Sequence, residues 1–192
     1  MLRALELAQS AHGRTWPNPM VGCVVVRDGV ILAEGSTQPC GQDHAEADAL
    51  RKLNFQAEGA TIYVNLEPCC HWGRTPPCTD AIIRSGVRRV VVGTRDPHPL
   101  VDGKGIQALR DAGIEVVVGL HEDAARGLNE AHWISFTERR PFVTLKAAVT
   151  LDGRTATREH ESKWITGEAA RAHARRERGL HQGVLIGVGT LL

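Results

Sequence analysis

The sequence lacks three features, and each absence excludes a class of protein. No apolar stretch approaches the roughly 20 residues that a membrane-spanning helix requires. The start of the chain has no long apolar core of the kind found in secretory signal peptides, which predicts a cytoplasmic protein. The 23 Lys and Arg residues are balanced by 22 Asp and Glu residues, whereas proteins that grip nucleic acid carry an excess of positive charge. These absences favour a small-molecule substrate over a membrane or a nucleic acid.

The composition is that of an ordinary globular protein. Apolar residues make up 42% and charged residues 23% of the 192 residues, and we find no internal repeat or low-complexity tract. This length suits one domain of typical size plus a remainder. A polar, proline-containing connection at residues 138–141 precedes a new apolar segment. We therefore predict a domain boundary near residue 140, which separates residues 1–140 from residues 141–192.

Hydrophobic periodicity and turn signals predict strands that alternate with helices in residues 1–140. Asp28-Gly29 is a tight-turn signal between apolar runs at 21–26 and 30–33, so a hairpin is expected there. Asp43 is placed to cap a helix at residues 44–53. The other expected elements are helices beginning at Leu2, at 78–85, at 105–112 and from 122 into the 130s, and strands at 61–66, 89–93 and 114–119. This alternation predicts an α/β fold with helices on both faces of the sheet.

Five cysteines form an odd set in a chain that looks intracellular, where clustered Cys with His indicates a metal more often than a disulfide. His44, Cys69 and Cys78 match the three ligands of a catalytic zinc site, which keeps a fourth position for water. Two of these ligands fall at predicted helix starts, where the partial positive charge favours a thiolate. Glu46, two residues after His44, is the candidate general base that moves protons to a departing amine. Together these residues are the parts of a hydrolytic zinc deaminase.

Other interpretations stay open on these residues alone. His-x-Glu pairs occur by chance, and a structural zinc site would recruit a fourth protein ligand such as Cys70 or His71. That interpretation gives Glu46 no role. The segment between the cysteines, residues 70–77, is a proline-stiffened loop in which Arg74 is either a phosphate-binding cation or a solvated charge.

Four segments of the chain resemble the riboflavin-biosynthesis deaminase/reductase family. They are Glu67-Pro68-Cys69-Cys70-His71-Trp72-Gly73-Arg74-Thr75-Pro76-Pro77-Cys78, Pro17-Asn18-Pro19-Met20-Val21-Gly22, His44-Ala45-Glu46 and Asp96-Pro97-His98-Pro99-Leu100-Val101. The resemblance covers residues 1–192. It implies a cytidine-deaminase-like three-layer α/β/α sandwich with a mixed sheet, followed by a truncated dihydrofolate-reductase-like α/β segment.

The resemblance also implies an activity and a set of site residues. The first domain would deaminate 2,5-diamino-6-(5-phosphoribosylamino)pyrimidin-4-one hydrolytically and give the corresponding aminouracil. Its cofactor would be Zn²⁺, held by His44, Cys69 and Cys78, with Glu46 as the proton shuttle. By similarity, the residues that contact the pyrimidine, ribose or phosphate would be Asn18, Arg74 and Asp96. An amide at Asn18 can pair with a base edge, and it also suits a turn between two prolines.

Residues 142–192 resemble the opening of the family's reductase domain. The pattern there predicts a strand at 142–149, a helix at 167–178 and a strand at 183–188. By similarity, Ala148, Trp164 and Thr190 match nicotinamide-cofactor positions, and Ser162 and Arg178 match substrate positions. Only the first part of that domain is present, so NADPH would bind only if it were complete, and we expect no reductase activity. An exposed apolar edge in this segment would favour self-association into a homo-oligomer.

The chain departs from the family pattern near the expected pocket. Cys70 replaces a serine, His98 replaces an asparagine, and residues 37–41 replace a His-x-Lys-Ala-Gly stretch. These changes leave the zinc ligands untouched and alter the expected pocket rim. Two alternative functions therefore stand beside the deaminase: a catalytically silent, zinc-stabilised binding or assembly protein, and a deaminase of another base or nucleoside.

Overall fold

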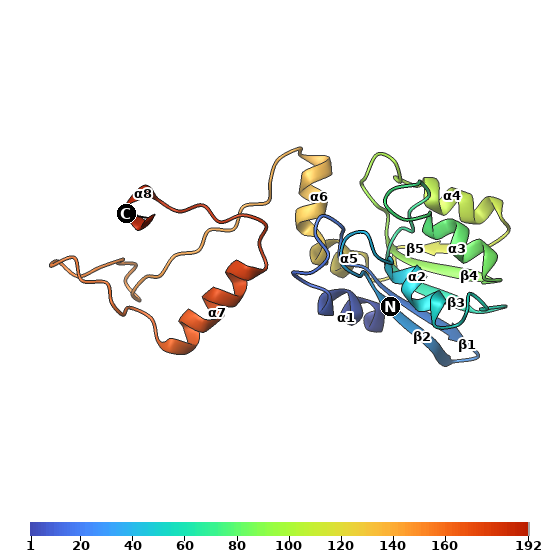
Figure 1. Ribbon diagram of the computed structural model, residues 1–192, viewed down its shortest axis with the longest axis horizontal. Coiled ribbons are helices and arrows are strands. Elements are labelled where there is room, and N and C mark those ends of the chain that lie inside the picture. Colours follow the sequence, from blue (N-terminus) through green and yellow to red (C-terminus); the bar gives the residue numbers. More distant parts are fainter. Residues whose placement is uncertain (192) are drawn as a thin grey trace. The chain divides into compact units, whose positions relative to one another are not determined.

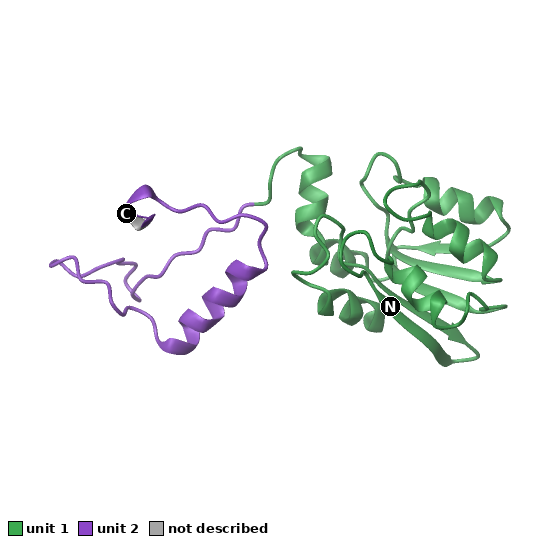
Figure 2. Cartoon of the chain, viewed as in Figure 1, with its two compact units in different colours: residues 1–142 green, residues 143–192 purple. Residues whose placement is uncertain are grey.

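A computed structural model describes residues 1–191 of the chain (Figure 1). The chain divides into two compact units, Met1–Phe142 and Val143–Leu192, which are coloured separately in Figure 2. The first unit contains the β-sheet and its covering helices. Among the described residues, no helix has the length and apolar character needed to cross a bilayer.

The first unit is built on a mixed, five-stranded sheet whose order is β2-β1-β3-β4-β5. Its strands are β1 (Gly22–Arg27), β2 (Val30–Ser36), β3 (Thr61–Leu66), β4 (Arg89–Thr94) and β5 (Glu115–Val118). β1 runs antiparallel to β2 and β3, whereas β3, β4 and β5 are parallel. The predicted hairpin is confirmed, because Asp28 and Gly29 join β1 to β2 with φ angles of 52° and 78°, as a tight hairpin turn requires.

Helices cover both faces of the sheet, as the alternating pattern predicts (Figure 1). One face carries α1 (Leu2–Ser10) and α5 (Glu122–Leu128), which contact each other. The other carries the neighbouring helices α2 (Ala45–Arg51), α3 (Cys78–Arg84) and α4 (Lys104–Asp111). Strands β1 and β4 carry continuous valine runs, Val24–Val26 and Val90–Val92, as expected for strands covered on both faces, whereas β3 alternates Ile62, Val64 and Leu66 with more polar residues. The core includes Val25, Leu50, Ile62, Val64, Ile82, Val90, Val92 and Leu109.

A glycine lets α2 approach the sheet closely. A Cβ atom at Gly35 of β2 would lie 2.2 Å from the carbonyl oxygen of Ala45 and 2.6 Å from the backbone nitrogen of Ala49. Only a residue without a side chain fits at this crossing. The contact fixes the first turn of α2, the turn that contains His44 and Glu46 at its start.

Two details of the first unit differ from the sequence predictions. The cap of α2 is His44 rather than Asp43, whose carboxylate pairs instead with Arg51 at 2.6 Å. The single helix expected from residue 122 into the 130s is two helices, α5 and α6 (Glu130–Thr137), which meet at Asn129. The Asn129 side chain bonds the backbone of Met20, and this distant contact holds the residue out of helical geometry.

The second unit has one of its three predicted elements. The helix expected at 167–178 is α7 (Glu168–Gly179). The strands predicted at 142–149 and 183–188 are wrong: the first segment is irregular, and the second leads into the short helix α8 (Val188–Leu191). A strand needs a neighbour for its backbone N–H and C=O groups, and in the described part of residues 143–192 neither segment pairs with another strand. Leu145 and Leu185 are accordingly 91% and 99% exposed.

Candidate active site

Three side chains from separate segments converge at the start of α2 and α3. His44 precedes α2, Cys69 follows β3, and Cys78 is the first residue of α3. One potential ligand atom of each lies within 4.8 Å of the others, and among the described residues this is the group of such side chains that could hold a metal ion. The Nδ1 atom of His44 lies 3.5 Å from Cys69 Sγ and 3.4 Å from Cys78 Sγ. The structure thus brings together the three ligands predicted from the sequence.

The spacing of these atoms suits a tetrahedral zinc ion. Bonds of about 2.3 Å to sulfur and about 2.0 Å to nitrogen, at a tetrahedral angle, separate the two ligand atoms by about 3.5 Å. Both nitrogen-to-sulfur distances at the site agree with that separation. Imidazole and thiolate are also the donors that zinc prefers. The residues present therefore fit a zinc ion bound by three protein ligands.

A hydrogen bond between the Cys78 and Cys69 side chains shifts the pKa values of both cysteines in opposite directions. The pKa of Cys69 is lowered to about 4, chiefly because the Cys78 thiol donates a hydrogen bond to it, with His44 contributing further. The same hydrogen bond, together with burial, raises the pKa of Cys78. The backbone N–H of Cys78 also points at Cys69 Sγ from 3.4 Å. Both sulfur atoms would bind a metal ion as thiolates, so metal binding at this site would release protons.

Glu46 lies beside this cluster in the first turn of α2 and is 3% exposed. Burial raises its pKa to about 7, and the negative charge of Cys69 adds to the effect. A carboxyl group with that pKa can both accept and donate a proton near neutral pH. The arrangement supplies a general base and acid that is not needed to complete the ligand set.

The loop between the two cysteines contacts the site through a residue that sequence reasoning missed. Thr75 Oγ1 lies 3.4 Å from His44 Nε2, on the side of the ring that faces away from the sulfur atoms. A partner on the second ring nitrogen orients a metal-binding histidine. Arg74, in contrast, is exposed and contacts Cys40 Sγ at 2.9 Å.

The two residues considered as a fourth ligand point elsewhere. The Cys70 thiol donates to the carbonyl oxygen of Leu100 at 3.6 Å, and its pKa is raised by burial. The His71 ring stacks on His98 with ring centres 5.6 Å apart. Neither belongs to the cluster of potential ligand atoms. The geometry therefore favours three protein ligands over a closed, four-ligand structural site.

Asp96 and Met20, the second residue after Asn18, both contact the α5–α6 segment. Asp96 is buried, and its Oδ1 accepts hydrogen bonds from the His98 backbone at 2.8 Å and from His132 Nε2 of α6 at 2.9 Å. Asn129, at the start of α6, bonds both the N–H and the C=O of Met20, two residues after Asn18. His132 and Asn129 carry no local sequence signal, because their partners lie 36 and 109 residues away.

The reductase-like positions lie in the second unit. Ala148 is half-buried, whereas Ser162 and Arg178 are exposed. Trp164 is 70% exposed and stacks on the guanidinium of Arg171, whose Cζ atom lies 4.3 Å from the ring centre. The side chain of Thr190 falls outside the described part of the structure.

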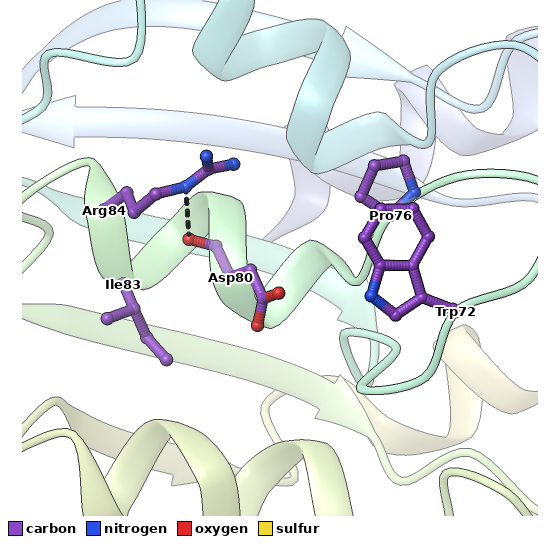
Figure 3. Close-up of a pocket in the computed structure, with 5 residues that line it drawn as sticks. All are labelled: Trp72, Pro76, Asp80, Ile83 and Arg84. Atoms are coloured by element: carbon purple, nitrogen blue, oxygen red, sulfur yellow. Dashed lines mark hydrogen bonds between the residues drawn. The ribbon is translucent and has the colours of Figure 1, made fainter.

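A shallow cleft of about 370 Å³ lies beside the site rather than in it. Figure 3 shows Trp72 and Pro76 of the loop at one end of the cleft and Asp80, Ile83 and Arg84 of α3 along it. Its lining includes neither the three potential metal ligands nor Glu46. The chemistry therefore belongs to the cluster between α2 and α3, not to this cleft.

The fold and the site together define a class. A mixed sheet covered by helices on both faces, with His, Cys and Cys at helix starts and a glutamate beside them, is the arrangement of the zinc-dependent deaminases. Residues 1–94 match the family model described as the cytidine and deoxycytidylate deaminase zinc-binding region, and residues 141–192 match that of the RibD C-terminal domain.

Relatives that align with the whole chain, and so with both of these segments, identify the family. The chain is 53% identical over 192 residues to the riboflavin biosynthesis protein RibD of Aquifex aeolicus and 47% identical to that of Escherichia coli, covering all of this chain and 54% and 52% of those proteins. A crystal structure of a diaminohydroxyphosphoribosylaminopyrimidine deaminase/5-amino-6-(5-phosphoribosylamino)uracil reductase from Thermotoga maritima superposes with a TM-score of 0.92 at 48% identity, covering 100% of this chain and 55% of that one. The chain belongs to the RibD family, and it spans about half the length of the curated relatives it matches.

Proposed function

We propose that residues 1–142 catalyse the hydrolytic deamination of 2,5-diamino-6-(5-phosphoribosylamino)pyrimidin-4-one to 5-amino-6-(5-phosphoribosylamino)uracil. The observation that carries the proposal is the convergence of His44, Cys69 and Cys78 next to the buried carboxyl group of Glu46. The similarity to RibD proteins, whose solved relative from Thermotoga maritima is named for this deamination, supports the choice of substrate.

The proposed reaction assigns a task to each residue at the centre. Zinc held by His44, Cys69 and Cys78 would act as a Lewis acid that activates water at its fourth position. Glu46 accepts a proton as the water oxygen attacks the amine-bearing ring carbon. It then donates that proton to the amine nitrogen as the carbon–nitrogen bond breaks and ammonia leaves.

Three further residues are proposed to bind the substrate. Asn18, half-buried between α1 and β1, offers an amide that can pair with the edge of the pyrimidine. Arg74 has an exposed guanidinium, which suits a phosphate group. Asp96 is held in place by the His98 backbone and His132, which fixes a carboxylate for donor groups on the ring or the ribose.

The direct test measures ammonia release from the diaminopyrimidinone phosphate with the zinc-loaded full chain. We expect turnover that a chelator abolishes and added zinc restores. The Glu46→Gln variant should keep its zinc and lose about 10²–10⁴-fold in rate, the usual contribution of a general acid–base. A zinc-loaded chain that releases no ammonia, or a Glu46→Gln variant as active as the parent, would contradict the proposal.

A further inference from the structure

The motif that carries Cys69 begins with Glu67, a residue to which the proposed reaction gives no task. Its side chain is 3% exposed. Among the ion pairs of the described residues, none includes it. A buried carboxyl group is costly unless its oxygens accept hydrogen bonds. The hydrogen-bond partners of the Glu67 carboxyl group therefore indicate its structural role.

Three backbone N–H groups donate hydrogen bonds to the Glu67 side chain. Oε2 accepts from Asp96 at 3.2 Å and from Gly103 at 3.0 Å, and Oε1 accepts from Ile106 at 3.1 Å. Asp96 lies just after β4, whereas Gly103 and Ile106 form the start of α4. One carboxyl group thus joins the ends of two strands to a helix.

The start of α4 depends on this carboxyl group. Its N-cap residue, Gly103, has a φ angle of 86° and no side chain, so it cannot satisfy the free N–H groups of the first turn itself. Glu67 does so from a distant segment. At Gly105 a Cβ atom would lie 2.1 Å from the carbonyl oxygen of Pro68, so this turn rests directly on the backbone that precedes Cys69.

We propose that Glu67 is a positioning residue that fixes Cys69 and Asp96 relative to each other; the inference rests on the proposed metal site and reaction. The Glu67 backbone N–H donates to Thr94 O at 3.0 Å, which extends the pairing of β3 and β4 by one residue. From the other side, α3 holds Cys69 through the N–H of Thr79, 3.1 Å from the Cys69 carbonyl. The Glu67 carboxyl group holds the other end of this segment, so the Cys69 sulfur and the Asp96 carboxylate keep a constant separation.

The test compares Glu67→Gln and Glu67→Ala with a matched core variant, Val25→Ala, in the full chain. Val25 is fully buried on β1 opposite Ile62, five residues before Glu67, so its truncation lowers stability without touching the Cys69 segment. Three quantities are measured for each protein: urea unfolding, zinc affinity by competition with a chelator, and the absorption spectrum of the cobalt-loaded form. Cobalt reports the geometry of the thiolate ligands independently of turnover.

We expect Glu67→Ala to weaken zinc binding by about 10–100-fold, the usual effect of removing a group that orients a ligand, and to alter the cobalt spectrum. Glu67→Gln should show a smaller loss, because its amide oxygen still accepts hydrogen bonds. Val25→Ala should keep both properties. If the Glu67 variants lose stability only, with the metal affinity and spectrum of the parent, the positioning role is refuted.

Failure of the reaction and failure of this inference give different results. A parent chain that binds zinc and releases no ammonia refutes the proposed reaction, while the metal affinities of the Glu67 variants still decide the positioning role. A parent chain that binds no zinc refutes both.

Discussion

The contact between Gly35 and the first turn of α2 gives a quantitative prediction. In Gly35→Ala the new Cβ atom would lie 2.2 Å from the Ala45 carbonyl oxygen, whereas ordinary contact begins at 3.4 Å. The two backbones must therefore separate by about 1.2 Å. Ala45 lies between His44 and Glu46, so the displacement moves both a potential metal ligand and the proposed proton carrier.

Two effects of different size should follow. Overpacking of this kind costs about 1–3 kcal/mol of unfolding free energy. A misplacement of about 1 Å at a reacting group costs about 10²-fold in rate. We therefore expect Gly35→Ala to remain folded, to be easier to unfold in urea, and to lose about 10²-fold in kcat/KM for ammonia release.

Gly127→Ala is the matched control, because this glycine lies within α5 and an added Cβ meets no atom within 4 Å. Replacing a helical glycine by alanine should raise stability by up to about 1 kcal/mol and leave activity unchanged. A Gly35→Ala protein with the parent's kcat/KM would show that the edge strand β2 yields instead of α2. That result would refute the reasoning.

Three further predictions test the surroundings of the site. Asn129→Ala removes both hydrogen bonds to Met20, so it should cost about 1–3 kcal/mol in urea unfolding and raise KM through the Asn18 loop; an unchanged KM would separate that loop from the substrate. Removing zinc with a chelator should lower the Tm of the chain, because a ligand of the folded state at 1,000 times its Kd adds about 4 kcal/mol; a Tm independent of zinc would contradict binding at this site. Cys70→Ser should keep full zinc content and activity, since the Cys70 thiol faces the Leu100 carbonyl; loss of zinc would make Cys70 a ligand.

Local patterns predicted most of the first unit. The β3 strand begins and ends at the residues predicted for it, 61 and 66, and Asp28-Gly29 forms the expected turn, because both signals act over a few residues. Asn129 shows the limit of such patterns. Its helix breaks because the side chain bonds Met20, 109 residues away, and no local periodicity contains that contact. The strands expected at 142–149 and 183–188 fail for a related reason, since apolar character alone does not supply a pairing partner.

The candidate site likewise contains residues that local sequence patterns predict and residues whose contacts only the fold creates. His44, Cys69, Cys78 and Glu46 stand out in the sequence because their chemistry is uncommon in this combination, and the structure places the three ligand atoms together. Glu67 belongs to the same motif, yet its hydrogen bonds to Asp96, Gly103 and Ile106 depend on the topology of the sheet. Residue type predicted the candidate metal ligands and the candidate proton carrier, whereas the contacts that hold them are visible only in the fold.

X-ray absorption at the zinc edge of the substrate-free full chain tests the central claim most directly, because it counts the atoms bound to the metal. Three protein ligands and an open position predict two sulfur atoms at about 2.3 Å from the zinc ion. They also predict one imidazole nitrogen and one solvent oxygen, each at about 2.0 Å from the zinc ion. A third sulfur atom or a second imidazole would close the site and contradict the proposed deaminase.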